Sequence, residues 1–555
     1  GFVTDDAVVV VEGIHRRVLE GSAAPVAGAI TDLTAPVIWS TLATVVVFAP
    51  LGLLSGVVGQ FFRSLSLTLS AAVLASLVLA LTLIPLLARW GIRKSASGHG
   101  KASRLDRAYV RTVRPVIARP VLAAVLAVAL GLAGVALYFQ VGSGFLPHAD
   151  EGGFVVDYQT PAGTALEETD RVLRKVEQVL LKTPEVAAIQ RRTGSELGLF
   201  ATQANSGDVL VRLKDRGQRS RSSEDIISDL RDQLHEAAPG LDIEFVQLLQ
   251  DMLGDLEGSP TPIEVKVFGD DASVLAELGE QIEEMLGKVE GVVDIVGVQS
   301  GTPEMTWQID PVAAGRLGLT VADVSQQLSS AWLGEIATDH LALDRNIPVR
   351  VRYPDAVRLD GGRLGQTMVR GADGKTAPVS ALATQVAATG QTVPSRENLR
   401  QMALVSGYLE GRDLGSAVAE ITTKLQSTKL PVGYTWEVGG QYLSQRQAFR
   451  ELLEVLGIAS ALVFLILVIH FRAFRPAVLI LAAAPLSLAG ALVALIATGT
   501  ELNVSSAMGL VLVSGLVVKN GIVLLDYAER ERERGIAPAQ AVYDAAHVRL
   551  RPILM

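Results

Sequence analysis

Three charged side chains lie in apolar stretches of this sequence, where a charge is costly. Asp5 and Asp6 directly precede the run Ala7–Val11, and Lys519 lies inside the otherwise uncharged run Val504–Leu525. Charged residues within membrane segments are rare, face the interior of a helix bundle, and mark ion paths or proton relays. Two carboxylates and one ammonium carry one net negative charge, so a single added proton makes the group neutral. These residues therefore predict proton transfer inside a membrane.

An internal repeat relates the two stretches. Gly1–Glu12 aligns without a gap with Gly515–Asp526, at a constant offset of 514 that also places Gly21 on Gly535. If the two copies pack about a pseudo-twofold axis, the carboxylates of one copy meet the ammonium of the other. The alternative is an exposed helix cap and a turn of a soluble domain, which the apolar flanks disfavour.

The elements that must position these charges are membrane-spanning helices. Crossing a hydrocarbon core of about 30 Å takes about 20 apolar residues. The chain is 49% hydrophobic, with a mean hydropathy of +0.36. Runs of this kind are Leu33–Leu54, Leu65–Ala88, Val121–Phe139, Leu452–Ile469, Ala477–Thr498 and Val504–Leu525. We expect six spans, with the first twelve residues as the end of a seventh.

The basic residues predict the orientation of these spans. The segment Arg89–Arg119 holds nine Lys and Arg residues and one acid, Asp106. Short loops rich in Lys and Arg lie on the cytoplasmic side. Counting crossings from there places the long insert Gln140–Gln447 on the opposite, periplasmic side.

The long insert alternates strand and helix patterns, so it is predicted to be folded. Its first part reads βαββαβ, the ferredoxin-like order in which two helices cover one face of a four-stranded sheet. A second unit repeats this order around an inserted subdomain, Glu304–Asn398, which contains the hairpin signal Gly371–Lys375. The predicted fold is a polytopic α-helical membrane protein with a pseudo-twofold repeated bundle, two periplasmic ferredoxin-like α+β units and an inserted docking subdomain.

Composition argues against several other functions. A net charge of −9 and a pI near 5.5 disfavour nucleic-acid binding, which normally needs a basic face. The absence of cysteine excludes disulfides and thiolate metal ligands. The seven histidines form no close ligand pair, so no metal site is predicted. No nucleophile–His–acid set or phosphate loop points to an enzyme.

Three motifs carry a resemblance to a known family. They are Asp5-Asp6-Ala-Val-Val-Val-Val-Glu12, Val518-Lys519-Asn520 and Arg549-Leu-Arg-Pro-Ile-Leu-Met555. The sequence resembles the resistance-nodulation-division (RND) efflux pumps, and more closely their hydrophobe-exporting multidrug branch than their heavy-metal branch. The resemblance covers essentially the whole chain. It implies an internal fragment that lacks helices one to three, the first periplasmic half and the last two helices.

The resemblance also implies roles for individual residues. Asp5 and Asp6 would be the protonatable pair, Lys519 their countercharge, and Arg549 the arginine at the cytoplasmic side of the relay. The activity would be proton/substrate antiport, with protons as the coupling ion and no other cofactor. Glu12 and Asp526 are interpreted as solvated charges at helix ends.

Substrate is expected to bind away from the relay. In the family a glycine-rich loop crosses the cleft between two periplasmic units, and Gly194–Gly207 is our candidate for it. Gly194, Gly198 and Gly207 allow backbone changes, and Phe200 offers an aromatic face to an apolar ligand. The alternative is a flexible strand connection anchored by one phenylalanine. Aromatic residues make up only 5% of the chain, which weighs against broad drug specificity.

These expectations divide the chain into consecutive parts. They are a helix tail (1–12), a cytoplasmic connection (13–32), two spans (33–89), a basic cytoplasmic linker (90–119), a span (120–139), the first porter unit (140–250), the second porter unit (260–303 and 399–447) with the inserted docking subdomain (304–398), three spans (452–528) and a cytoplasmic connection (529–555).

Two other functions remain open. Heavy-metal efflux by the same fold is one, although the seven methionines form no cluster suited to soft ions. A non-transporting membrane sensor or scaffold is the other, although it would not need charges within the bilayer. The resemblance implies a homotrimer in the bacterial inner membrane, a periplasmic adaptor (membrane fusion protein), an outer-membrane channel and a small, hydrophobic or amphiphilic substrate.

Overall fold

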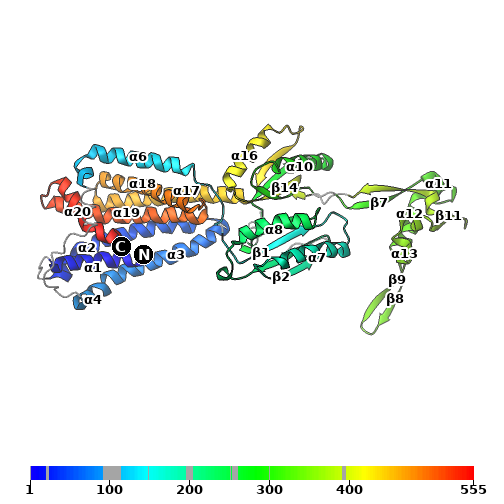
Figure 1. The fold of residues 1–555 in the computed structure, drawn as a ribbon, viewed down its shortest axis with the longest axis horizontal. Coiled ribbons are helices and arrows are strands. Elements are labelled where there is room, and N and C mark those ends of the chain that lie inside the picture. The colour runs from blue at the N-terminus through cyan, green and yellow to red at the C-terminus, as the bar shows by residue number, and fades with distance from the viewer. Residues whose placement is uncertain are drawn as a thin grey trace.

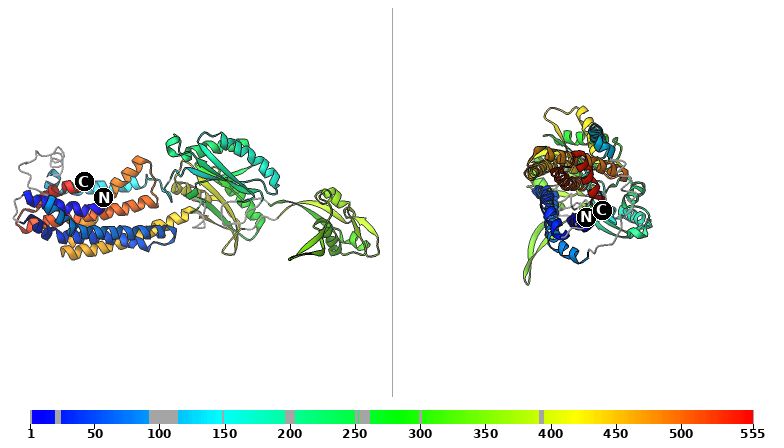
Figure 2. Two further views of the ribbon diagram at one scale, coloured as in Figure 1. Left: turned by 90° about the horizontal axis from the view of Figure 1, so that it is seen from below. Right: turned by 90° about the vertical axis from the view of Figure 1, so that its left-hand side faces the viewer.

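Three regions follow one another along the long axis of the molecule: a helix bundle, a pair of α+β units and a small outlying subdomain (Figure 1). The computed structural model describes residues 2–19, 24–91, 114–147, 149–195, 204–249, 252, 261–298, 301–390 and 395–554. The two ends of the chain lie together in the helix bundle, although the whole of the other two regions separates them in sequence (Figure 2).

Six helices in the described part of the chain are long and apolar enough to cross a membrane, in agreement with the six predicted runs. The helices of the bundle are α1 (Phe2–Leu19), α2 (Pro25–Phe48) with the 3-10 turn η1 (Ala49–Leu53), α3 (Gly56–Leu81), α4 (Leu83–Gly91), α6 (Pro120–Tyr138), α17 (Gln441–Phe471), α18 (Phe474–Thr498), α19 (Val504–Glu533) and α20 (Pro538–Leu554).

Several helix ends differ from those expected. The first helix continues past Glu12 to Leu19, where Arg16 and Arg17 in its last turn complement the helix dipole. The second begins at Pro25, because proline is well suited to the first helical position. The third starts before Leu65 and stops at Leu81, four residues before Pro85, whose ring would clash with that carbonyl. The expected connection 13–32 is therefore mostly helical.

Close packing holds α19 in the centre of the bundle. A Cβ on Gly515 would lie 3.3 Å from Val47 on α2, and one on Gly521 would lie 3.1 Å from Ile480 on α18. Small residues let membrane helices approach closely, so α19 is held tightly between these two neighbours.

The first porter unit is a four-stranded antiparallel sheet with strand order β2-β3-β1-β4. Its core lies between the sheet and its two helices, where Phe154, Val156 and Tyr158 alternate inward along one strand. The elements are β1 (Gly153–Gln159), α7 (Leu166–Lys182), β2 (Val186–Thr193), β3 (Ser206–Leu213), α8 (Ser223–Ala237) and β4 (Asp242–Val246).

The second porter unit has the same topology. In its sheet β14 pairs with β5 and β6, β5 pairs with β15, and β13 adds a short strand beside β14. The elements are β5 (Ile263–Phe268), α10 (Ala272–Leu286), β6 (Val292–Val296), β13 (Ser395–Glu397), β14 (Arg400–Leu409), α16 (Leu414–Ser427) and β15 (Thr435–Gly439). Both ferredoxin-like units are thus confirmed.

The inserted subdomain is joined to the second unit by two antiparallel strands, β7 (Pro303–Ile309) and β12 (Ala383–Thr389). It has its own small core around Val324 and Val379. The predicted hairpin is present, with β10 (Met368–Arg370) paired to β11 (Thr376–Pro378). A second hairpin, β8 (Glu335–Ala342) and β9 (Arg345–Val351), projects away from the rest of the molecule (Figure 1).

Candidate functional site

Asp6 and Lys519, predicted to meet across the repeat, form a buried ion pair. The Lys519 Nζ atom lies 2.7 Å from Asp6 Oδ1, and the two side chains are only 2% and 1% exposed. Thr41, on α2, donates a hydrogen bond of 3.1 Å to the other oxygen of Asp6. Three helices, α1, α2 and α19, therefore supply this site. The side chain of Asp5 lies outside the part of the chain that the structure describes.

The contacts of this pair depend on the charge of Asp6. While Asp6 is ionised, the attraction to Lys519 offsets the cost of burying both charges. A proton on Asp6 would remove that attraction, and Lys519 would then be left without this ionised partner.

Arg549 belongs to a second group of charged residues. This group lies towards the end of the helix bundle that the basic residues predict to be cytoplasmic. Arg549 is 7% exposed, and burial, followed by repulsion from Arg16, lowers the pKa of its guanidinium to about 10, so it stays charged at neutral pH. It lines a cavity of about 40 Å³. The cavity is bounded by Val9, Glu12, Gly13, Arg16, Asp32, Leu33, Asp526, Tyr527, Arg530, Glu531, Arg534, Val548 and Arg549.

The segment that follows α6 ties α19 to the second porter unit. Leu502, directly before α19, donates its backbone N–H to Gly142 at 2.8 Å and accepts one from Gly144 at 3.1 Å. Between these residues, the Ser143 N–H donates to the Asp413 carboxylate at 3.1 Å, and Asp413 caps helix α16. One short segment therefore contacts both the Lys519 helix and the second unit.

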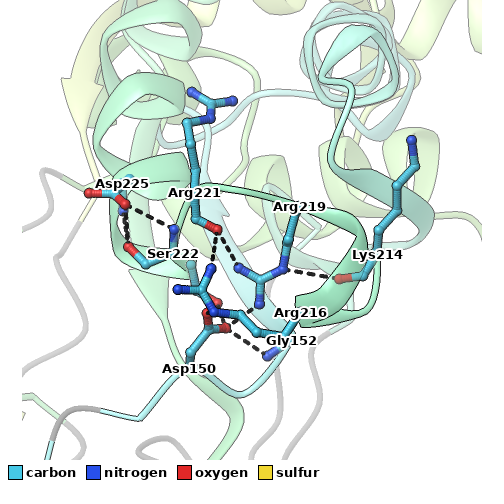
Figure 3. Close-up of polar contacts among 9 residues, drawn as sticks. Asp150, Gly152, Lys214, Arg216, Arg219, Arg221, Ser222 and Asp225 are labelled. Atoms are coloured by element: carbon cyan, nitrogen blue, oxygen red, sulfur yellow. Dashed lines mark hydrogen bonds and ion pairs between the residues drawn. The ribbon is translucent and has the colours of Figure 1, made fainter.

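The same segment is fixed to the first porter unit through Asp150 (Figure 3). Asp150 forms an ion pair with the buried Arg219 and accepts a hydrogen bond from the Ser223 hydroxyl. The hydrogen bond from Arg219 is the main reason that the pKa of Asp150 lies well below its usual range. Arg219 also donates to the carbonyl oxygens of Lys214 at 3.0 Å and Arg221 at 2.7 Å, so its position is fully specified.

A cavity of about 260 Å³ lies between this segment, both porter units and the end of the helix bundle where α17 and α19 begin. Its wall combines apolar side chains with several charged ones. The wall includes the apolar Phe145, Leu146, Ile227 and Phe245 and the charged Arg231 and Glu410.

The predicted glycine-rich loop is described only at its two ends. Gly194 has a φ of +71°, which favours glycine, and its N–H donates to the Ser206 carbonyl at 2.9 Å. A Cβ on Gly207 would lie 2.3 Å from the Tyr158 hydroxyl and 2.5 Å from the Arg192 carbonyl. Gly198 and Phe200 lie outside the described residues.

Sequence reasoning missed a row of charged residues across the first sheet. Strand register places Arg192 opposite Asp208, Asp208 opposite Asp157, and Asp157 opposite Glu244. Alternation puts the row on the face away from the helices. Arg192 Nε donates to Asp208 at 2.6 Å. In the described parts of the chain, no group of three His, Cys, Asp or Glu residues is arranged to hold a metal ion.

Comparison with known proteins finds relatives whose names describe them as metal-resistance proteins. The chain is 29% identical to the "Cobalt-zinc-cadmium resistance protein CzcA" of Cupriavidus metallidurans, covering 100% of this chain and 55% of the relative. It is 27% identical to the "Nickel and cobalt resistance protein CnrA" of the same organism, with 100% and 54% covered. The chain thus spans about half the length of the curated relatives that it matches.

A solved structure agrees with the observed fold. The crystal structure of a "heavy metal efflux pump" matches with a TM-score of 0.86 and 26% identity, over 100% of this chain and 55% of that one. The family model described as "AcrB/AcrD/AcrF family" matches residues 1–555. With this match, the repeated helix bundle and the paired porter units, the chain belongs to the AcrB/AcrD/AcrF family.

Proposed function

We propose that the full-length protein exports its substrate from the inner membrane or periplasm in exchange for protons. The observation that carries this proposal is the buried Asp6–Lys519 ion pair. Breaking a buried pair costs about 3–5 kcal/mol. The membrane potential supplies about 2.3 kcal/mol per charge per 100 mV, so proton influx delivers energy on the same scale.

The segment after α6 offers a route from the ion pair to the porter units. Lys519 lies on α19, and Leu502, two residues before α19, is hydrogen-bonded to Gly142 and Gly144. Ser143 of this segment contacts the second unit, and Asp150 contacts the first. A shift of α19 on protonation of Asp6 would therefore move the two units, and the cavity between them would change shape.

Divalent metal cations are the cargo that we favour. The sequence favoured hydrophobic compounds, but the relatives reported above are described as metal resistance or efflux proteins. In this chain, Asp208, Asp157 and Glu244 lie side by side across the first sheet, but Asp208 is buried and paired with Arg192, so the support for metal cargo comes from the relatives and not from this row. Carboxylate oxygen and imidazole suit ions such as Zn²⁺, whereas soft ions need sulfur ligands, of which this chain has few.

Hydrophobic or amphiphilic compounds are the second candidate. The cavity of about 260 Å³ supports it, because Phe145, Leu146, Ile227 and Phe245 give its wall an apolar part. Ligand pockets are mostly apolar, with a few polar groups that set orientation.

The assembly proposed with this function is a homotrimer in the inner membrane. A periplasmic adaptor and an outer-membrane channel would complete the export path. The inserted subdomain, residues 304–398, would be the docking surface, because it lies at the far end of the molecule from the helix bundle (Figure 1).

The test uses the full-length protein in proteoliposomes with an imposed pH gradient. Proton flux is measured while Zn²⁺, Co²⁺ or apolar compounds are added, for wild type, Asp6→Asn and the control Glu454→Gln, an exposed carboxylate on α17. We expect Zn²⁺ or Co²⁺ to stimulate flux in wild type and the control but not in Asp6→Asn. Full flux in Asp6→Asn would contradict antiport. Stimulation by apolar compounds alone would select the second cargo, and flux that never responds would favour a sensor.

A further inference from the structure

Three exposed arginines lie at the end of the helix bundle that the basic residues predict to be cytoplasmic. Arg119 directly precedes α6, Arg472 directly follows α17, and Arg475 lies in the first turn of α18. Within the described part of the chain, none of the three side chains forms a hydrogen bond, an ion pair or a ring contact. Their charges are therefore available to a molecule outside the chain.

Two acidic residues of α19 at the same end are already paired. Asp526, which approaches His470 two residues before Arg472, binds Arg530 at 2.9 Å. Glu529 binds Arg532 at 2.9 Å. Neither carboxylate lies within ion-pair distance of the three arginines, which therefore form a patch of uncompensated positive charge.

Helix packing brings Arg119 to the level of the other two arginines. α6 and α18 lie side by side (Figure 1). A Cβ on Gly131 of α6 would lie 3.5 Å from Leu486 of α18. One turn later in both helices, a Cβ on Gly134 would lie 3.2 Å from Ala489, so the two helices run in the same direction. Following both back by about 18 Å from the first contact reaches Arg119 on one side and the start of α18 on the other.

The surface next to these arginines is apolar and open. Val121 and Val125 on α6 and Phe474 and Leu479 on α18 are each more than half exposed. Apolar side chains on the outside of spanning helices contact lipid acyl chains, and arginines at the helix ends reach the level of the headgroups. An occupant that covers this whole surface must be anionic at one end and apolar along its length.

We propose that Arg119, Arg472 and Arg475 bind the headgroup of an anionic phospholipid, whose acyl chains lie along α6 and α18. The planar guanidinium group donates two hydrogen bonds to a phosphate, which makes arginine well suited to this ligand. Basic pockets between spans on the cytoplasmic side bind anionic headgroups. Free phosphate or a soluble acidic protein would match the charge but leave the apolar surface uncovered.

A lipid bound here would hold together two helices that are far apart in the sequence. α6 leads into the segment that contacts both porter units, and α18 packs against the Lys519 helix. The lipid would thus fasten α6 to the bundle at the headgroup level. This inference goes beyond the proposed antiport and does not depend on it.

The test measures lipid binding to delipidated full-length protein by native mass spectrometry. The probes are phosphatidylglycerol, phosphatidylethanolamine with the same acyl chains, and inorganic phosphate. The variants are Arg475→Gln, Arg475→Lys and the double variant Arg472→Gln/Arg475→Gln. The matched control is Arg532→Gln, because Arg532 is an exposed arginine at the same end but is paired with Glu529.

We expect phosphatidylglycerol to bind wild type and the control equally, and phosphatidylethanolamine to bind much more weakly. The affinity for phosphatidylglycerol should fall roughly fivefold in Arg475→Gln and roughly 25-fold in the double variant. Arg475→Lys keeps the charge and should lose less than Arg475→Gln. The thermal midpoint of wild type should rise on addition of phosphatidylglycerol, because a ligand of the folded state stabilises it, and should rise less in the double variant.

Several results would overturn the proposal. They are equal affinities for the two lipids, unchanged affinity in the double variant, or an equal loss in Arg532→Gln. Inorganic phosphate that displaces the lipid at equal concentration would show a phosphate site in place of a lipid site. A further check needs only wild type: raising the salt from about 0.05 M to about 0.5 M should weaken binding, because salt screens exposed charges. Binding that ignores salt would also count against the arginines.

Discussion

Arg231 of the first porter unit and Asp294 of the second join the two units through a doubly hydrogen-bonded ion pair. Arg231 Nε lies 2.7 Å from Asp294 Oδ1, and Nη2 lies 3.0 Å from Oδ2. The Asp294 side chain is 0% exposed, and the guanidinium lies over the Phe245 ring at 5.3 Å. Glu410 contacts the same arginine and, with it, lines the larger cavity. This contact sets how the two units meet beside that cavity.

Removing the charge of Asp294 is expected to loosen this junction. Asp294 has a φ of +49°, which asparagine also tolerates, so Asp294→Asn changes the charge without new backbone strain. Glu410 still pairs with Arg231, so the cost should stay below the about 3–5 kcal/mol expected when a buried charge loses its partner completely. We expect a lower thermal midpoint and faster hydrogen exchange in β4 and β6. Glu168→Gln, which breaks the exposed Arg171–Glu168 pair, should change neither measurement.

Thr41 is expected to be needed for transport through its hydrogen bond to Asp6. Hydrogen bonds to charged groups contribute about 1.5 kcal/mol or more, so Thr41→Val should lower proton-driven flux roughly tenfold. Thr41→Ser keeps the hydroxyl and should retain most of the flux. Thr44→Val is the matched control, because buried Thr44 donates to the carbonyl of Ser40 in its own helix. Equal losses at both positions would refute a specific role for Thr41.

Asp150 is expected to make stability depend on acid pH. Its pKa is lower in the folded protein than the ordinary 3.8, so its contribution is present above about pH 4 and is lost as the pH falls further. At neutral pH, Asp150→Asn should cost about 1–2 kcal/mol after allowance for solvent screening. When the pH is lowered from neutral to acid, the thermal unfolding midpoint of Asp150→Asn should fall less steeply than that of the wild type. Asp215→Asn, at a nearby exposed position, should follow the wild-type curve.

Gly207 is expected to tolerate no side chain. An added Cβ would displace the Tyr158 hydroxyl, which donates to the Arg192 carbonyl at 2.8 Å. Overpacking of this kind costs about 1–3 kcal/mol. Gly207→Ala should therefore lower the thermal midpoint, whereas Gly217→Ala, with open space around it, should not. An unchanged midpoint in Gly207→Ala would show that the base of the loop rearranges freely.

The sequence predicted the parts of this molecule that depend on local pattern. Uncharged runs of about 20 residues located the spans, and alternation located the strands of both porter units. The contact between Asp6 and Lys519 was also predictable, because a constant offset between repeats implies a symmetric packing.

Features that depend on register between distant segments were not predictable. Asp157, Asp208 and Glu244 become neighbours only when three strands align, and nothing local sets that alignment. Asp526 was interpreted as a solvated charge at a helix end, but helix packing places its Oδ1 atom 3.5 Å from Nε2 of His470 and leaves its side chain only 17% exposed. Arg231 and Asp294 lie in different units, so their pairing depends on how those units dock.

The Asp6–Lys519 pair also has a consequence for biosynthesis. The two residues lie more than 500 positions apart, so a ribosome adding about 5–20 residues per second needs on the order of half a minute to two minutes to supply the lysine after the aspartate. During that interval the aspartate helix has no Lys519 to pair with. The nascent helix must then be sheltered at the insertion machinery or enter the bilayer with Asp6 protonated.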